Sequence, residues 1–279
     1  MTPEVLRYAA FTRDPAGGNP AGIVLDAQGL DDAAMQAVAA EVGYSETAFV
    51  TAGPADGALT VRYFSPQAEV PFCGHATIAT AVAWAERHGA RPLELHTAAG
   101  LVAVETAATA DGPAATLTSV APSGEPVADA DLDEALAALR WSRAELDPAL
   151  PPRIAAAGAR HLVLAAATRA RLADLDYDFE RLRALMARLD LTTLQLVFRA
   201  GPSEFHARNP FPPGGVVEDP ATGAAAAALG GYLRELGLVE PPAEVVVHQG
   251  TELGRPSLLR VGIPPTGGIR DTGTAVPMR

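Results

Sequence analysis

The sequence predicts an α+β fold with two pseudo-symmetric domains, in each of which a rolled β-sheet wraps around one central helix. Two observations lead to this prediction. The same order of predicted strands and helices occurs twice along the 279 residues, and one helix of each repeat has almost no polar face. We expect the domains at residues 1–120 and 121–279, joined near the Pro-, Gly- and Ser-containing segment APSGEPVAD, with chain ends that can cross from one domain to the other.

The first half of each repeat is a strand followed by an amphipathic helix. The strands are GIVL (22–25) and HLVL (161–164), and the helices are expected at Asp31–Val42 and Phe179–Leu189. A second apolar strand follows in each repeat, ETAFV (46–50) in the first and LQLVF (194–198) in the second.

The second half of each repeat is a helix rich in small residues. The segments CGHATIATAVAWAERHG (73–89) and ATGAAAAALGGYLRELG (221–237) have equal length, and each ends on a Gly suited to a helix C-terminus. Equal numbers of residues separate Ala48 from Cys73 and Leu196 from Ala221. Residues 224–232 lack a polar stripe of period 3.6, which is typical of a buried helix. This agreement in spacing indicates an ancient duplication.

Composition excludes several kinds of chemistry. The net charge of −12 argues against nucleic acid or an anionic membrane as partner. All 21 cationic residues are arginine, so a pyridoxal-phosphate Schiff base, a lysine nucleophile and a P-loop lysine are excluded. A single cysteine, Cys73, excludes an intrachain disulfide and two-thiol catalysis. Apolar runs are too short for a membrane span and no secretory signal is visible, so we expect a cytoplasmic protein.

Both small-residue helices begin in a polar segment. Backbone N–H groups in a first helical turn lack helical partners and favour an anion, so two such helix starts facing one another would bind a small carboxylate-bearing molecule. The candidate binding residues there are Gly74, Ala76, Thr222, Gly223 and Ala224. The alternative is that Asp219 and Thr222 are ordinary N-cap residues, and Asp219 can also do both.

Glu46 is the candidate acid/base residue. In a strand it shares a face with Ala48 and Val50, so its carboxylate points the same way as core side chains. A carboxylate shielded from water is suited to proton transfer near neutral pH. The alternative is a solvated strand end.

His75 and Cys73 flank the start of the first small-residue helix. His75 is either a structural histidine or a donor to substrate, and its Gly-flanked position favours the second role. Cys73 is either a small buried filler or a nucleophile activated by the helix N-terminus.

Two loops add candidate binding residues. GGNPAG (17–22) is interpreted as a turn, with Asn19 a possible ligand. HQGTELGRPS (248–257) offers Gln249 and Arg255, the latter either a carboxylate clamp or a surface residue of a hairpin. Neither His75 nor His248 has zinc-site spacing and no dinucleotide fingerprint is found, so no metal is predicted.

The motifs GNPAGIVL, YSETAFV, RYFSPQAEVPFCGHATIATA, EDPATGAAAAAL and HQGTELGRPS occur in this order over nearly the full length. Together they resemble the PhzF-like family, the phenazine-biosynthesis isomerase and its relatives. The resemblance implies the diaminopimelate epimerase-like fold, an active site between the domains, no cofactor and usually a homodimer.

The resemblance also implies an activity, isomerisation of trans-2,3-dihydro-3-hydroxyanthranilate. Glu46 matches the family's general acid/base, and His75 and Asp219 match residues that hold the substrate's polar groups. One position departs from the pattern: the phenazine enzyme has a serine where this chain has Ala224, which puts that substrate in doubt. The alternatives are an epimerase or racemase that uses Cys73 with Glu46, and a non-catalytic ligand-binding protein.

Overall fold

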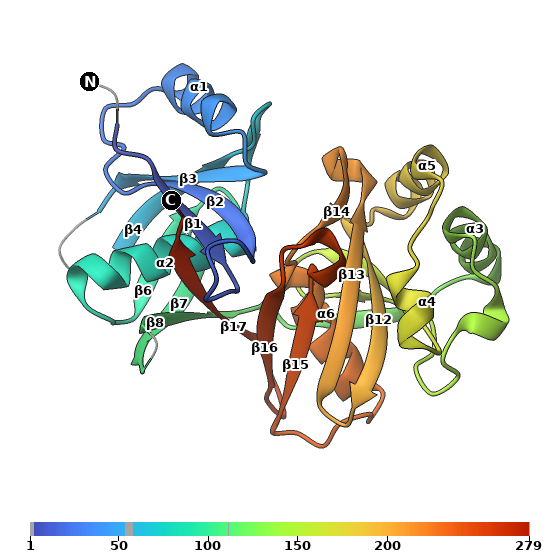
Figure 1. The fold of residues 1–279 in the computed structure, drawn as a ribbon. Coiled ribbons are helices and arrows are strands. Elements are labelled where there is room, and N and C mark those ends of the chain that lie inside the picture. Colours follow the sequence, from blue (N-terminus) through green and yellow to red (C-terminus); the bar gives the residue numbers. More distant parts are fainter. Residues whose placement is uncertain (1–2, 54–57, 111, 279) are drawn as a thin grey trace. The chain divides into compact units, whose positions relative to one another are not determined.

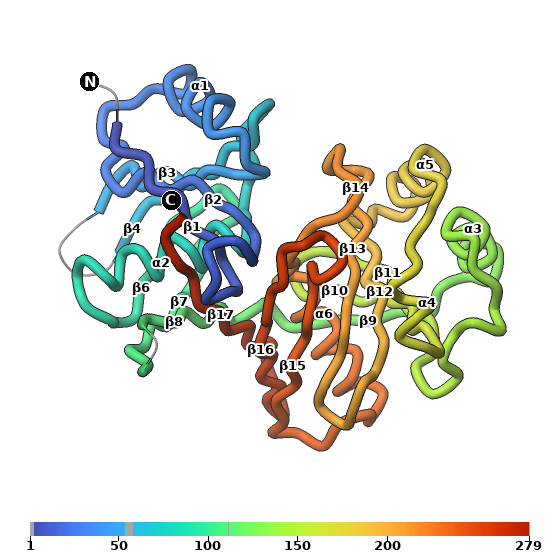
Figure 2. Tube along the Cα trace, in the orientation of Figure 1, coloured from blue at the N-terminus to red at the C-terminus, as the bar shows by residue number. Residues whose placement is uncertain are grey.

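The structure is a computed structural model that describes residues 3–53, 58–110 and 112–278. It contains two compact units, unit 1 with Met1–Thr118 and Thr272–Arg279, and unit 2 with Ser119–Asp271. The C-terminal strand β17 (Arg270–Pro277) pairs antiparallel with β1 (Leu6–Ala10), and Figure 2 shows the two strands side by side. Within the described ranges, no helix is long and apolar enough to cross a membrane.

The strands of unit 1 pair with one another in a closed ring. After β1 they are β2 (Asn19–Val24), β3 (Glu46–Ala52), β4 (Ala58–Phe64), β5 (Glu69–Val70), β6 (Leu93–Thr97), β7 (Gly100–Thr109) and β8 (Gly112–Thr118). The pairs β2–β3 and β4–β6 are parallel, whereas β1–β2, β3–β4, β6–β7 and β7–β8 are antiparallel. Because β17 pairs with both β1 and β8, the sheet closes into a barrel.

Helix α2 (Gly74–His88) fills this barrel. It contacts β1, β2, β3, β7 and β8, and ten of its residues are buried, from His75 to Ala85. Alanine and threonine dominate this helix, so the strands can approach it closely. Figure 1 shows α1 (Asp32–Val42) away from α2 and next to β3. There Met35 of α1 packs with Phe49 and Phe64 of the sheet.

Unit 2 also places its small-residue helix among strands. The strands are β9 (Ser123–Pro126), β10 (Arg153–Ala156), β11 (Arg160–Ala165), β12 (Thr193–Gly201), β13 (Glu204–Phe211), β14 (Val216–Asp219), β15 (Ala243–Gln249) and β16 (Ser257–Ile263). Pairing runs β9–β10–β11–β12–β13–β15–β16, with β14 also paired to β13. Helix α6 (Gly223–Glu235) contacts β9, β10, β11, β12 and β16 and is buried from Ala225 to Leu233, so the expected buried helix is confirmed.

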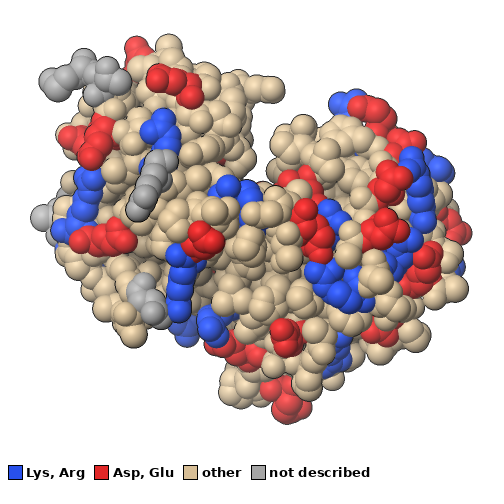
Figure 3. Space-filling model, in the orientation of Figure 1, with Lys and Arg blue, Asp and Glu red and all other residues tan. Residues whose placement is uncertain are grey.

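The other face of this sheet is covered by helices. They are α3 (Asp129–Leu139), α4 (Arg169–Ala173) and α5 (Phe179–Leu189). The connections of unit 2 also contain the 3₁₀ turns η1 (Arg143–Glu145), η2 (Pro212–Gly214) and η3 (Thr251–Leu253). Leu182, Leu185 and Met186 of α5 join α3 and the sheet in one apolar cluster. Acidic and basic side chains alternate on the face of unit 2 shown in Figure 3. Among the ion pairs of this unit, Arg143 pairs with Asp129 and Asp133.

The mixed α/β character and the sheet barrel agree with the predicted fold class. The two amphipathic helices predicted at Asp31–Val42 and Phe179–Leu189 are confirmed as α1 and α5. The interpretation of residues 17–22 as a turn is wrong in part, because β2 begins at Asn19 and pairs with β1 from that residue on. That the two units arose by duplication stays a prediction.

Candidate active site

The first group of candidate residues lies at the N-terminal end of α2 in unit 1. Cys73 is the N-cap residue, and its carbonyl oxygen accepts hydrogen bonds from Thr77 N at 3.0 Å and from Thr77 Oγ1 at 2.7 Å. The N–H groups of Gly74, His75 and Ala76 in this first turn have no partner within the helix. A Cβ atom on Gly74 would meet no described atom within 4 Å beyond its chain neighbours and the backbone of its own helix, so no other element covers the helix start at this residue.

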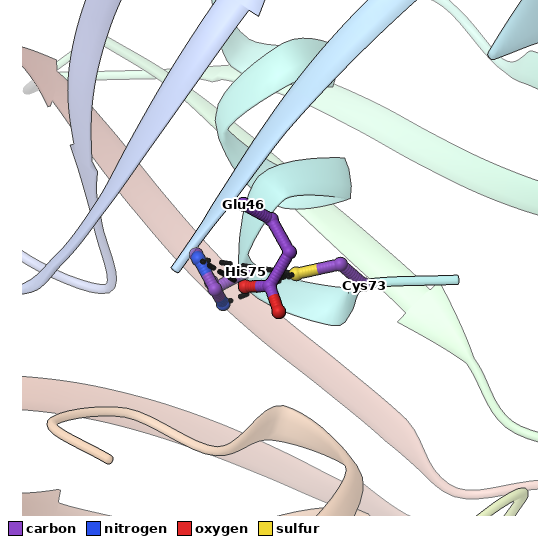
Figure 4. Close-up of side chains that lie close together, drawn as sticks. All are labelled: Glu46, Cys73 and His75. Atoms are coloured by element: carbon purple, nitrogen blue, oxygen red, sulfur yellow. Dashed lines mark hydrogen bonds and ion pairs between the residues drawn. The ribbon is translucent and has the colours of Figure 1, made fainter. Parts of the chain in front are cut away.

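Three side chains converge in front of this helix turn, as Figure 4 shows. Cys73 Sγ donates to Glu46 Oε2 at 3.4 Å and lies 3.3 Å from His75 Nδ1. His75 Nε2 lies 3.5 Å from the same carboxylate oxygen, Glu46 Oε2. The side chains of His75 and Glu46 are 8% and 18% exposed, so the group is shielded from bulk water but not sealed from it.

Strand pairing explains why Glu46 reaches this point. Glu46 is the first residue of β3 and is in parallel register with Ala21 of β2. The next four residues, Thr47–Val50, are all buried. The carboxylate therefore stands at the edge of the apolar interior, beside the start of the helix that fills the barrel.

A hydrogen-bonded pair behind the group holds the helix start in place. Tyr63 of β4 is fully buried, and its hydroxyl lies 2.6 Å from Thr77 Oγ1, the same hydroxyl that bonds the Cys73 carbonyl. Burial raises the pKa of the Tyr63 phenol, so it stays neutral. This neutral network fixes Cys73 and the first turn without adding charge next to Glu46.

Unit 2 contains a second polar group at the start of α6. Thr222 Oγ1 donates to Asp219 Oδ2 at 2.5 Å, and Gln249 Nε2 donates to the Asp219 carbonyl oxygen at 2.8 Å and to Thr222 Oγ1 at 3.0 Å. The Thr222 N–H in turn donates to Gln249 Oε1 at 3.1 Å. Thr222 is the N-cap residue but makes no side-chain capping bond, so its hydroxyl serves Asp219 instead.

Gly250 explains the close approach of the HQGTELGRPS hairpin to this group. Its φ of 75° lies in the left-handed region, and a Cβ atom there would come within 2.6 Å of the Pro220 carbonyl oxygen and 2.4 Å of the Arg255 carbonyl oxygen. Only glycine fits this position, and it sets Gln249 against the start of α6.

The remaining predicted binding residues differ in how deeply they are buried. Asn19 is buried at the first residue of β2, and Gly223 is buried at the first residue of α6, where Ala224 is half-buried. The Ala76 side chain is fully buried, so only its backbone is available to a ligand. Arg255 is half-buried in the β15–β16 hairpin.

Several polar residues around these groups were missed from sequence. Ser45 Oγ lies 3.4 Å from His75 Nε2. Its position next to Glu46 in the YSETAFV motif was the signal that could have identified it. In unit 2, His161 Nδ1 lies 2.8 Å from Thr193 Oγ1, which also accepts from Asn209 Nδ2 at 3.1 Å. Burial lowers the pKa of His161 to about 3, so this histidine is neutral.

The trio of Glu46, Cys73 and His75 is also a set of potential metal ligands. One ligand atom from each lies within 4.8 Å of the other two, and no other such group of three occurs in the described part of the chain. Local spacing around His75 predicted no metal, but spacing along the chain cannot reveal a third ligand from a different strand. Because this group combines a carboxylate, a thiol and an imidazole, it is the candidate reactive site of unit 1.

Comparison with known proteins finds relatives along nearly the whole chain. Residues 8–279 match the profile of a family described as phenazine biosynthesis-like protein, PhzC-PhzF. The chain is 32% identical over 270 residues to the "Uncharacterized isomerase YddE" of Escherichia coli O157:H7, covering 94% of this chain and 91% of the relative. It is 34% identical over 258 residues to the trans-2,3-dihydro-3-hydroxyanthranilate isomerase of Pseudomonas chlororaphis, covering 90% and 86%.

A solved structure is similar over the same extent. The PhzF family phenazine biosynthesis protein of Bacillus anthracis superposes with a TM-score of 0.87 at 26% identity, over 99% of this chain and 96% of that protein. The likeness therefore extends through both units.

Proposed function

The chain belongs to the phenazine biosynthesis-like (PhzF) family and is an isomerase, and from this we propose that it moves a proton between two carbons of a small carboxylate-bearing substrate without a cofactor. The carboxylate of Glu46 takes the proton from one carbon and returns it to another. The electron pair of the broken C–H bond moves into the substrate's π system, and a π electron pair forms the new C–H bond. Glu46 is a carboxylate again at the end of the reaction. The observation that carries this proposal is the convergence of Glu46 and His75 at the open N-terminal turn of α2.

The other candidate residues also have roles in the proposed reaction. His75 donates a hydrogen bond to the substrate oxygen on which negative charge develops, and the N–H groups of the first turn of α2 hold an anionic group of the substrate. In unit 2, Asp219 accepts a hydrogen bond from a substrate amine or hydroxyl group. The Thr222 hydroxyl donates to the Asp219 carboxylate and orients it, and Gln249 donates to the Asp219 backbone carbonyl oxygen and holds the residue in place.

The contact between Cys73 and Glu46 supports this mechanism over an epimerase with the same two residues. An epimerase that uses an acid and a base needs them on opposite faces of the reacting carbon. Cys73 Sγ and Glu46 Oε2 are hydrogen-bonded to each other at 3.4 Å, so both would meet a substrate from one side. A single carboxylate that removes and returns a proton on one face fits this arrangement.

A relative whose name states its reaction supports a proposal for the substrate class. The Pseudomonas chlororaphis enzyme acts on trans-2,3-dihydro-3-hydroxyanthranilate, a cyclic amino acid with a carboxylate and a hydroxyl group. We propose a substrate of this class for this chain, with Ala224 removing one hydroxyl contact and so shifting preference among its members.

The test is turnover of trans-2,3-dihydro-3-hydroxyanthranilate and related cyclic amino acids by wild type, Glu46→Gln and Glu94→Gln. Glu94 is an exposed glutamate of β6 and gives a matched control for loss of one carboxylate. We expect Glu46→Gln to lower kcat/KM by about 10²–10⁴-fold, the usual contribution of a general acid/base. Equal activity of the two variants would show that Glu46 does not carry the proton.

A further inference from the structure

The three atoms that meet at the start of α2 have the separations of ligands around one tetrahedral metal ion. Cys73 Sγ lies 3.8 Å from His75 Nε2 and 3.4 Å from Glu46 Oε2, and His75 Nε2 lies 3.5 Å from Glu46 Oε2. With Zn–S near 2.3 Å and Zn–N and Zn–O near 2.1 Å, tetrahedral angles place such ligands about 3.4–3.6 Å apart. An ion could therefore enter with only small movements of the three side chains.

We propose that this trio is a binding site for Zn²⁺ and similar thiophilic divalent cations, and that the bound ion inhibits the enzyme. A thiolate, an imidazole and a carboxylate together suit zinc or cobalt, whereas calcium and magnesium prefer oxygen ligands alone. Three protein ligands leave a fourth position for water. On binding, the Cys73 S–H bond breaks, a metal–sulfur bond forms and one proton passes to the buffer.

The surroundings favour retention of the ion once it is bound. Cys73 is 8% exposed and the other two side chains are mostly shielded, so few water molecules compete for the ligand atoms. Cys73 and His75 are held by the first turn of α2, which Thr77 and Tyr63 fix from behind. Ser45, now 3.4 Å from His75 Nε2, can transfer its hydrogen bond to the metal-bound water.

The inhibitory effect rests on the proposed function, because it arises when the ion occupies the carboxylate oxygen that would accept the substrate's proton. Binding itself does not depend on the reaction. The two are therefore tested separately, binding by spectroscopy of the resting protein and inhibition by turnover.

The sole cysteine makes the spectroscopic test specific. Cobalt(II) bound to a thiolate gives a sulfur-to-cobalt charge-transfer band, and in this chain only Cys73 can supply that sulfur. The stacked pair His206 and His248 in unit 2 can also attract cobalt, but it cannot produce this band. The reduced protein is titrated with Co²⁺, and the band is then displaced with Zn²⁺.

We expect the band to saturate at one Co²⁺ per chain, to be absent in Cys73→Ser, and to show an affinity lower by at least about tenfold in Glu46→Gln and His75→Asn. Glu94→Gln and His248→Asn should retain the wild-type affinity. Thermal unfolding of each variant checks that it is folded. Absence of the band in wild type would overturn the proposal, and so would a band of the same affinity in Glu46→Gln and His75→Asn, because the thiol alone would then account for it.

Discussion

Cys73 donates a hydrogen bond from Sγ to Glu46 Oε2 at 3.4 Å, although the two residues come from different elements of unit 1. The thiol thus contacts the carboxylate that we propose as the acid/base, and it does so from the N-cap position of α2. Two groups in contact on one side of a site favour a proton shift on one face of the substrate.

Replacement of Cys73 by alanine should lower kcat/KM far less than Glu46→Gln does. The thiol provides one hydrogen bond to the carboxylate, worth about 1 kcal/mol or roughly fivefold in rate. Steady-state kinetics on the same substrate gives the ratio of the two effects. If Cys73→Ala lost as much activity as Glu46→Gln, the thiol would be an acid or base in its own right and the one-carboxylate mechanism would be wrong.

Replacement of Ala224 by serine should raise kcat/KM for trans-2,3-dihydro-3-hydroxyanthranilate. The new hydroxyl group, one residue into α6, adds a hydrogen-bond partner at the start of the helix. One such bond is worth about 1 kcal/mol, or roughly fivefold. Ala224→Val adds volume without a hydroxyl group and serves as control. An equal or lower rate for the serine variant would show that this position does not set the preference for that substrate.

Asp271 should make the protein less stable as the pH rises. It is 3% exposed, and neither carboxylate oxygen has a hydrogen-bond partner in the described part of the chain. Burial raises the pKa of Asp271 from 3.8 to about 7. Between these two values the folded protein keeps a proton that the unfolded chain has released, so the free energy of unfolding falls as pH rises through this window.

The variant Asp271→Asn tests this pH dependence. The amide resembles the protonated carboxyl group in shape and does not ionise, so the variant should lose most of the decline between pH 4 and pH 8, on the order of 1–4 kcal/mol. Urea unfolding at several pH values measures it for both proteins. The same decline in the variant would mean that other groups cause it.

Gly231 should not tolerate a side chain. A Cβ atom at this position of α6 would come within 2.4 Å of Pro122 Cβ, which is part of a rigid ring. We expect Gly231→Ala to lower the free energy of unfolding by about 1–3 kcal/mol, despite the higher helix propensity of alanine. Gly74→Ala is the matched control, because a Cβ there meets no described atom within 4 Å. Equal stabilities would show that α6 is packed less closely than described.

The sequence could predict the helices and the local motifs because these depend on neighbouring residues. The period of apolar residues located α1 and α5, and the lack of a polar face identified α6 as buried. Glu46 and His75 were each found in a short motif next to a strand or helix start. Their roles in the reaction stay predictions.

What the sequence could not predict depends on contacts between distant segments. The hydrogen bond between Tyr63 and Thr77, which supports the start of α2, depends on how the fold places β4 next to this helix. No local sequence pattern encodes that placement. The group of possible metal ligands forms only because the fold brings Glu46 of β3 close to Cys73 and His75 at the start of α2. Gln195 was visible as a polar residue in the apolar strand LQLVF, but its complete burial follows only from the sheet and helices around it.

The most direct test of the central claim is deuterium incorporation during turnover in D₂O, followed by mass spectrometry and NMR of the product. We predict that wild type and Glu94→Gln place at most one deuterium at the carbon that gains the proton, and that Glu46→Gln forms product and exchanges deuterium about 10²–10⁴-fold more slowly. Deuterium incorporation by Glu46→Gln at the wild-type rate would contradict the account, because another group would then be moving the proton.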